Sequence, residues 1–424
     1  MTRSLAIVKW AALSCALVLA LSTHVYAAVK EVPAGLAKFE SVRDEALPAV
    51  AAMTGLSYRD PMKADMMTRS EVADFVRRTV ALEYPNDELG KRSRCLAEIG
   101  LLPGGFDLTE GMIDLVGEQA GAIYDPHTKT LLGISDLPPY LQAPTTQKLI
   151  VSHEVCHALQ DLVIDIVARS RETVSDIDGE YALRSVIEGM ATVVMLAYCQ
   201  DLPIEQTPDV RATMRGGFSQ NQKNPGMKAL AASPVYLRES LISPYAEGGA
   251  FAQAWLKVNP GVKIGAMLAR MPATSEQVLH FDKYVEPDKP TLIDLSLVSS
   301  VLPEGWAFFY TNTLGEFDLR VLFDLREETR AVADQAAAGW DGLRFEAYTD
   351  SLDRLLLVGS SVWDSETDAE EFSVALQKTF TAVREAEDGI VAQSGTTVCF
   401  ALGPAEREIK ARLVEALSKS DPGN

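Results

Sequence analysis

Residues 152–161 carry the pattern of side chains in this sequence that is best suited to hold a metal ion. They read Ser-His-Glu-Val-Cys-His-Ala-Leu-Gln-Asp within a segment whose apolar residues recur at helical spacing. Four residues separate His153 from His157, so both imidazoles lie on one face of a helix and can bind the same ion. Zinc accepts neutral imidazole nitrogens at about 2.0–2.1 Å. The pattern predicts a Zn2+ site; the alternative is two surface histidines on a solvated helix.

Glu154, directly after the first histidine, is the predicted general base. Its position is rotated away from the two histidines, so its carboxylate can reach a water at the metal without displacing that water. Cys156 lies on another side of the helix. We expect it to be a core thiol, because a fourth protein ligand would close the position that a catalytic zinc keeps open.

A catalytic zinc needs a third protein ligand, and Glu188 is the preferred candidate. It lies among apolar residues in the next helical segment, and a carboxylate is rarely buried unless it is paired or bound to metal. Glu180 is the rival, but it falls near the start of that helix, where the helix dipole already accounts for an acid. Asp161 is either a hydrogen-bond acceptor for a ligand histidine or a solvated helix residue.

Two long helices and a hairpin must position these side chains. Apolar periodicity predicts helices over 146–168 and 178–198, which run antiparallel if a turn separates them. Gly189 is expected to let another backbone approach closely, as packing beside the first helix needs. The turn residues 125–128 separate two β-forming runs and predict a hairpin over 120–134.

The remaining pattern predicts an α+β fold that is mainly helical. Residues 28–339 would form the metal-binding domain, and residues 340–424 would form a small α+β lobe. Residues 203–234 are polar and contain glycine, which predicts a long surface loop. Further helices are expected over 33–54, 69–82, 108–119, 248–257, 260–270 and 367–385, and further strands over 343–348, 355–358 and 396–400.

The first 27 residues have the pattern of an export signal. Arg3 and Lys9 precede an apolar run, and Val25-Tyr26-Ala27 offers a cleavage site; an uncleaved N-terminal anchor is the alternative. The formal net charge is −20, and it becomes −22 without the two basic residues of this segment. Such an acidic chain is repelled by nucleic acid and by anionic membrane surfaces. We expect an exported protein, periplasmic or secreted, that is not an integral membrane protein once the signal is removed.

Four cysteines follow the predicted signal, too few and too far apart for a disulfide scaffold. If they pair, three connectivities are possible. They are Cys95, Cys156, Cys199 and Cys399.

The HExxH pattern followed by a glutamate in a second helix resembles the gluzincins, the thermolysin-like zinc metallopeptidases. His153 to Asp161 is similar to the HExxHALQDQ signature of a group of largely uncharacterised bacterial exported metallopeptidases. The resemblance implies a zincin-like core and extends over most of the chain. Met190, Phe281 and Leu162 depart from the group's pattern, but none of them is a predicted ligand or base. The other similar segments are 121–126, 273–280, 339–342 and 363–364.

The resemblance also implies how a peptide would bind and react. Gluzincins bind the peptide as an added strand on a sheet edge above the zinc, and the hairpin 120–134 is the natural candidate for that edge, although it could be an ordinary surface hairpin. Hydrolysis needs a donor for the tetrahedral oxyanion. His280 is preferred as a catalytic residue for this role over Tyr284 and Tyr245, and a packing or surface histidine is the alternative.

The sequence thus predicts an exported, zinc-dependent metallopeptidase that acts on a peptide or protein substrate with Glu154 as general base. A zinc-binding or scaffold protein with a non-catalytic metal site is the alternative from another class. Hydrolysis of a non-peptide amide is a third possibility. The substrate, the cleavage specificity and the oligomeric state cannot be predicted from the sequence.

Overall fold

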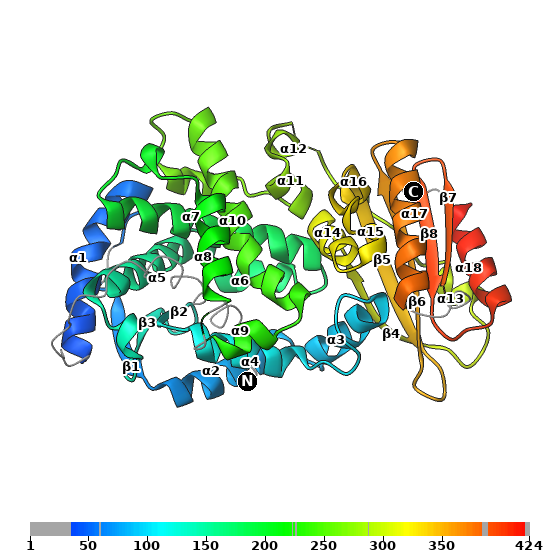
Figure 1. Cartoon of the computed structure of the whole chain (residues 1–424), viewed down its shortest axis with the longest axis horizontal. Coiled ribbons are helices and arrows are strands. Elements are labelled where there is room, and N and C mark those ends of the chain that lie inside the picture. Colours follow the sequence, from blue (N-terminus) through cyan, green and yellow to red (C-terminus); the bar gives the residue numbers. More distant parts are fainter. Residues whose placement is uncertain are drawn as a thin grey trace, which may run out of the picture.

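Figure 1 shows a computed structural model of the chain, which describes residues 35–58, 61–222, 224, 227–286, 288–383 and 389–419. The predicted export signal at 1–27 lies outside the described residues. The described chain is mainly helical and contains one three-stranded and one five-stranded sheet. The predicted α+β class is therefore confirmed.

The small sheet contains the predicted hairpin. Strands β2 (Ala122–Asp125) and β3 (Thr130–Ile134) pair antiparallel, as expected. A third strand, β1 (Lys63–Met67), pairs parallel with β3 on its other side, so β3 is central and β2 is an edge strand. The sequence analysis missed β1 because Lys-Ala-Asp-Met-Met is short and lacks β-branched and aromatic residues.

Three long helices form the centre of the larger half of the molecule (Figure 1). The first predicted helix ends earlier than expected: α5 spans Pro144–Ile164, because Asp165 adopts a left-handed φ of 47°. The Asp165 side chain then caps α6 (Ile166–Glu172) by accepting from the Ala168 amide. The second predicted helix is α7 (Ile177–Gln200), and the third helix is α10 (Val235–Val258).

Helix α7 lies against α10 with almost no space between the backbones. A Cβ atom on Gly189 would lie 2.1 Å from the carbonyl carbon of Gly248, so both positions require glycine. The expectation that Gly189 admits the metal-binding helix was wrong, because the backbone that approaches it belongs to α10. Among the described residues, α7 alone is long and apolar enough to cross a membrane, but 94% of its apolar window is buried in the core.

The predicted loop over 203–234 is wrong. The segment contains the short helix η3 (Ile204–Gln206), then α8 (Val210–Asn221) and α9 (Lys228–Ala232). Val210, Met214 and Phe218 recur every four residues and bury one face of α8, which packs on α10. The glycines and polar residues between them concealed this periodicity.

Helices α1, α2 and α4 follow the sequence prediction with adjusted bounds, whereas α3 and η2 were not predicted. Thr68 forms a capping box with Glu71 at the start of α2. The predicted helix over 248–257 is the second half of α10, and 260–270 contains a 3-10 helix instead of an α-helix. The bounds are α1 Leu36–Thr54, α2 Arg69–Glu83, α3 Glu88–Ile99, α4 Leu108–Gln119, η2 Pro139–Leu141 and η4 Ile264–Ala269.

The five-stranded antiparallel sheet forms the other half of the molecule, with strand order β4-β5-β6-β8-β7. The boundary that the sequence analysis placed at residue 340 divides this sheet, because β4 begins at Ala307. The strands are β4 Ala307–Thr313, β5 Trp340–Thr349, β6 Leu355–Trp363, β7 Gly389–Ser394 and β8 Thr397–Leu402.

Helices cover both faces of this sheet. Along β8, Val398 and Phe400 join the core under α17 (Glu366–Val383), whereas Cys399 and Ala401 join the core under α13 (Val298–Val301) and α18 (Arg407–Ser418). Short helices connect the two halves of the molecule: α11 Ser275–Leu279, α12 Phe281–Val285, α14 Glu316–Asp324, α15 Glu327–Arg330 and α16 Ala333–Ala337.

Candidate metal centre

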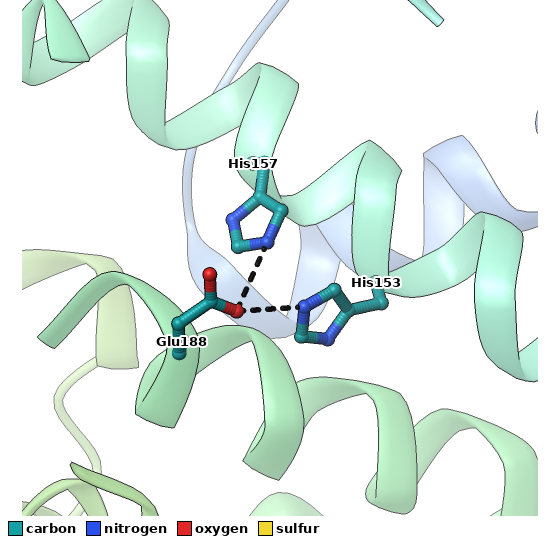
Figure 2. A group of neighbouring side chains, drawn as sticks. All are labelled: His153, His157 and Glu188. Carbon is teal, nitrogen blue, oxygen red and sulfur yellow. Dashed lines mark hydrogen bonds and ion pairs between the residues drawn. The ribbon is translucent and has the colours of Figure 1, made fainter. Parts of the chain in front are cut away.

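Three side chains of the kinds that can ligate a metal ion come from two helices and point at one another (Figure 2). His153 and His157 project from α5 one turn apart, and Glu188 projects from α7. The Glu188 Oε2 atom lies 3.0 Å from His153 Nε2 and 3.4 Å from His157 Nε2. One potential ligand atom from each residue lies within 4.8 Å of the others. The three side chains that the sequence predicted as ligands therefore come together.

The separations between these atoms suit a small cation. Two ligands at about 2.0–2.1 Å from a tetrahedral ion lie about 3.4 Å apart. Three protein ligands leave the fourth position of such an ion open, as a catalytic site requires. The buried atoms His157 Nε2 and Glu188 Oε1 have no hydrogen-bond partner among the described residues. Buried polar atoms normally have partners, so these donor atoms fit a bound ion.

Gln160, which the sequence analysis did not single out, orients one of the ligands. Its Nε2 atom donates to the carbonyl oxygen of Ile187, so its Oε1 atom is the acceptor that faces His157 Nδ1 at 2.8 Å. A neutral His157 would therefore carry its proton on Nδ1 and leave the lone pair of Nε2 free to bind an ion. Metal-ligating histidines are oriented by partners of this kind. Gln160 follows His157 by three residues on the same helix, and this spacing was the sequence signal that could have identified the contact.

The electrostatics of the cluster favour a positive charge between the three side chains. Burial would raise the pKa of Glu188, but the two imidazoles lower that pKa to about 2. Burial would lower the pKa of His157, but the Glu188 carboxylate outweighs it and raises that pKa to about 9. Burial and the neighbouring His157 lower the pKa of His153. The cluster therefore holds a proton on one imidazole, at a place that a metal ion can take.

Glu154 lies beside the cluster but is engaged by the edge strand. Its Oε2 atom accepts a hydrogen bond of 2.7 Å from the backbone N–H of Tyr124 in β2. Burial raises the pKa of the Glu154 carboxyl to about 8. A base with a pKa near the working pH is well suited to accept and return a proton. The nearby charge of a bound cation would lower this value.

Asp161 fastens the hairpin to the metal-binding helix and does not orient a ligand. Its Oδ2 atom accepts from the Tyr124 hydroxyl at 2.6 Å and also pairs with Lys129, while its Oδ1 atom accepts from the Ile166 amide. Tyr124 therefore binds α5 at two places, through its amide to Glu154 and through its hydroxyl to Asp161. Of the two roles considered for Asp161, the structure shows neither.

Glu180, the rival ligand, lies in a different cluster. Its carboxylate pairs with Arg92 at 2.9 Å and accepts from the Tyr84 hydroxyl at 2.9 Å. Glu180 precedes Glu188 by eight residues on α7, which corresponds to about 12 Å along the helix. Of the two glutamates, Glu188 is the one that lies against the two histidines.

Of the three candidates for the oxyanion donor, the structure brings Tyr245 alone to the cluster. The Tyr245 ring stacks on His153 with centroids 5.7 Å apart and is 1% exposed. The Tyr284 hydroxyl instead donates to the Arg270 carbonyl oxygen.

His280, the preferred candidate, lies elsewhere. Its Nε2 atom lies 2.8 Å from Glu316 Oε1. The preceding helix α11 docks on the first turn of α7, where the Ser275 amide donates to Asp178. Asp178 is ten residues from Glu188, or about 15 Å along α7. The structure therefore does not bring His280 to the metal-ligating side chains, and it departs from the role that the family resemblance implied.

The candidate site is closed in this structure. His153, Glu154, His157 and Glu188 are each 1% exposed or less, and every residue of β2 is buried. At the edge of β2 nearest the site, the Tyr124 amide donates a hydrogen bond to Glu154. A peptide could pair with this edge only after the hairpin or its surroundings move.

The described cysteines are all free, so none of the three possible pairings is formed. Cys156 is completely buried, as expected of a core thiol.

Comparison with protein-family models gives a match to part of the chain. A domain of unknown function (DUF8575) matches residues 308–412, which span most of the five-stranded sheet and its helices. The matched segment contains none of the three metal-ligating residues. No curated protein matches the chain. No solved structure matches it.

Proposed function

We propose that this protein is an exported zinc-dependent metallopeptidase of the gluzincin type. The observation that carries the proposal is the convergence of His153, His157 and Glu188 from two packed helices, with Glu154 next to the first histidine. Two imidazoles and a carboxylate are a ligand set that zinc prefers and that leaves one position for a substrate. Because the site is closed, a substrate can enter only after a movement of the protein. Because His280 lies elsewhere, another residue must stabilise the oxyanion.

Each residue of the cluster has a role in the proposed hydrolysis. When bound, zinc polarises the scissile carbonyl and lowers the pKa of a water. His153, His157 and Glu188 would hold the ion, and Gln160 keeps the His157 lone pair directed at it. Glu154 would take the proton from the attacking water and pass it to the leaving amine.

Tyr245 replaces His280 as the residue that we assign to the oxyanion. Its ring already lies against His153, and a phenol hydroxyl can donate a hydrogen bond to a developing negative charge. Because the site is buried, peptide binding would have to separate Tyr124 from Glu154. The substrate would then replace Glu154 at the amide of the edge strand and release the base for catalysis.

A non-catalytic zinc site is the second candidate, and the burial of the cluster favours it. A catalytic site must admit a substrate to the open position of its metal, but His153, Glu154, His157 and Glu188 are each 1% exposed or less. The presence of Glu154 favours catalysis, because three ligands alone hold a metal. Hydrolysis of a non-peptide amide would use the same residues.

Two measurements on the purified protein test the proposal. Elemental analysis after dialysis should give about one zinc per chain. Hydrolysis of an unfolded protein substrate should stop after zinc is removed with a chelator and return when zinc is restored. Zinc without hydrolysis would support the non-catalytic site, and the absence of zinc even after reconstitution would contradict both readings.

A further inference from the structure

A cavity of about 80 Å³ lies beside the candidate metal centre, between helices α3, α4, α7, α10 and α14. Its walls are mostly leucine and other apolar side chains, among them Leu96, Leu108, Leu115 and Leu237. Each of these four leucines is buried. An unfilled cavity destabilises a fold in proportion to its volume, so an apolar space of this size in a protein core calls for an explanation.

The cavity lies on the same side of α7 as the metal-ligating glutamate. Ile177, Tyr181 and Arg184 line it, and Glu188 follows them at positions that share one helix face. Arg184 is one turn before Glu188. The metal-ligating residues themselves are not part of the cavity wall. The cavity is therefore a neighbouring space and not the metal centre itself.

Four charged residues line the cavity, and two of them, Arg92 and Glu180, pair with each other. Arg92 pairs with Glu180 through Nη1 and donates to the Val174 carbonyl oxygen through Nη2. The second oxygen of Glu180 accepts from the Tyr84 hydroxyl. Neither group of the pair offers a free charge. The other two charged residues are Arg184 and Asp318, and Asp318 accepts a hydrogen bond from the Tyr236 hydroxyl.

One of the hydrogen-bond donors at the cavity wall belongs to Arg92. Arg92 is 7% exposed, and its Nε atom has no hydrogen-bond acceptor among the described residues. A buried donor without an acceptor is unfavourable, and a ligand that brings an oxygen acceptor would remove that cost. The apolar walls would hold the rest of such a ligand.

We propose that this cavity binds a small apolar molecule that ends in a hydrogen-bond-accepting oxygen, such as a short alkyl alcohol or a phenol. The volume has room for about five to eight water-sized atoms, which sets the size of the ligand. The site is too small for a peptide chain. The proposal goes beyond the proposed peptidase activity and holds for the protein with or without zinc.

The test uses 1-hexanol as the probe and the methyl group of Met112, a cavity residue, as the reporter. In protein labelled at its methionine methyl groups, 1-hexanol should shift the Met112 resonance in a saturable way. Met214, buried in α8 outside the cavity, should not move. Hexylamine has the same tail, but its ammonium accepts no hydrogen bond, so it should bind at least several-fold more weakly. A Met112 resonance that does not respond, or responds without saturation, would overturn the proposal.

Two substitutions make the test specific. Val116→Phe places a ring in the cavity and should weaken 1-hexanol binding at least tenfold, whereas Val374→Phe, on the exposed face of α17, should leave it unchanged. Arg92→Lys keeps a cation beside Glu180 but lacks Nε, and should weaken 1-hexanol several-fold without affecting hexylamine. Binding that is equal in the wild type and in a folded Val116→Phe protein would place the ligand elsewhere and contradict the proposal. The measurement on wild-type protein stands if a variant does not fold.

Discussion

The molecule contains two histidine–glutamate contacts with nearly the same distance and very different surroundings. In the helical half, His153 Nε2 and Glu188 Oε2 are 3.0 Å apart, and both side chains are almost completely buried. Where the two halves meet, His280 Nε2 and Glu316 Oε1 are 2.8 Å apart, and the His280 side chain is 41% exposed. The distance between the two groups therefore does not tell a metal ligand from an ion pair.

The groups that surround each contact distinguish the His153–Glu188 site from the His280–Glu316 pair. A second histidine, His157, converges on Glu188, and its Nε2 atom lies 3.4 Å from the same Oε2 atom that contacts His153. Near His280 the surrounding charges come from Glu276 and Arg320. A single exposed imidazole there can bind a proton and form a weak ion pair, whereas two buried imidazoles and one carboxylate form a ligand set.

The largest expected effect is on peptide hydrolysis, and it distinguishes the candidate metal centre from the His280–Glu316 pair. Glu154→Gln should reduce hydrolysis by about 10²–10⁴-fold, because an amide cannot accept the proton of the attacking water. The amide oxygen can still accept the Tyr124 N–H, so zinc content and folding should be retained. Glu316→Gln, the same change in the other region, should leave hydrolysis unchanged. Retained activity in Glu154→Gln would remove this residue as the base.

The next effect compares the two glutamates that contact histidines. Glu188→Gln should weaken zinc binding by more than about 100-fold, since substitutions in the outer shell alone cost 10–100-fold. Glu316→Gln should bind zinc as the wild type does. Competition with a chromophoric chelator measures both affinities. Equal zinc binding by the two variants would mean that Glu188 is not a ligand.

A smaller effect tests the orientation of His157. Gln160→Met should weaken zinc binding about 10–100-fold, because it removes the acceptor that fixes the imidazole. Gln147→Met is the control on the same helix, since Gln147 donates to the Leu141 carbonyl oxygen away from the cluster. If both variants bind zinc equally, the Gln160 contact does not orient the ligand.

The smallest effect concerns the exposed pair. The hydrogen bond to Glu316 raises the pKa of His280 above its usual value. A raised pKa contributes stability that is complete below the unfolded value of about 6.5 and is lost as the pH rises through the folded value. His280→Asn should therefore lower the free energy of unfolding more at about pH 6 than at about pH 9, by less than about 1 kcal/mol. Urea unfolding measures the difference. A larger loss at the higher pH would contradict the assignment.

The sequence predicted features that depend on local spacing. The pair His153 and His157 and the hairpin from 120 to 134 each lie within one short segment, where periodicity and turn residues report directly on geometry. Glu188 could be predicted because an acid among apolar residues needs a partner. These features gave most of the candidate metal centre.

Features that depend on distant segments could not be predicted in this way. Strand β1 pairs with β3 across 62 intervening residues, and β4 joins the sheet from outside the expected lobe. His280 was preferred on the family resemblance, and a resemblance in sequence does not report where the segment 273–280 packs. The contact of Tyr124 with Glu154 is made by a backbone amide, which no residue type reveals.

The parallel pairing of β1 with β3 also constrains the order in which the chain folds. The hairpin of β2 and β3 closes a loop of four residues, and such hairpins form in about 1–10 µs. Strand β1 can join only after the segment that contains α2, α3 and α4 has compacted, because a longer loop costs more entropy to close. The hairpin that contacts Glu154 is therefore available early, and the sheet that supports it is completed late. A chain at this intermediate stage would expose one edge of β3 to any other extended segment.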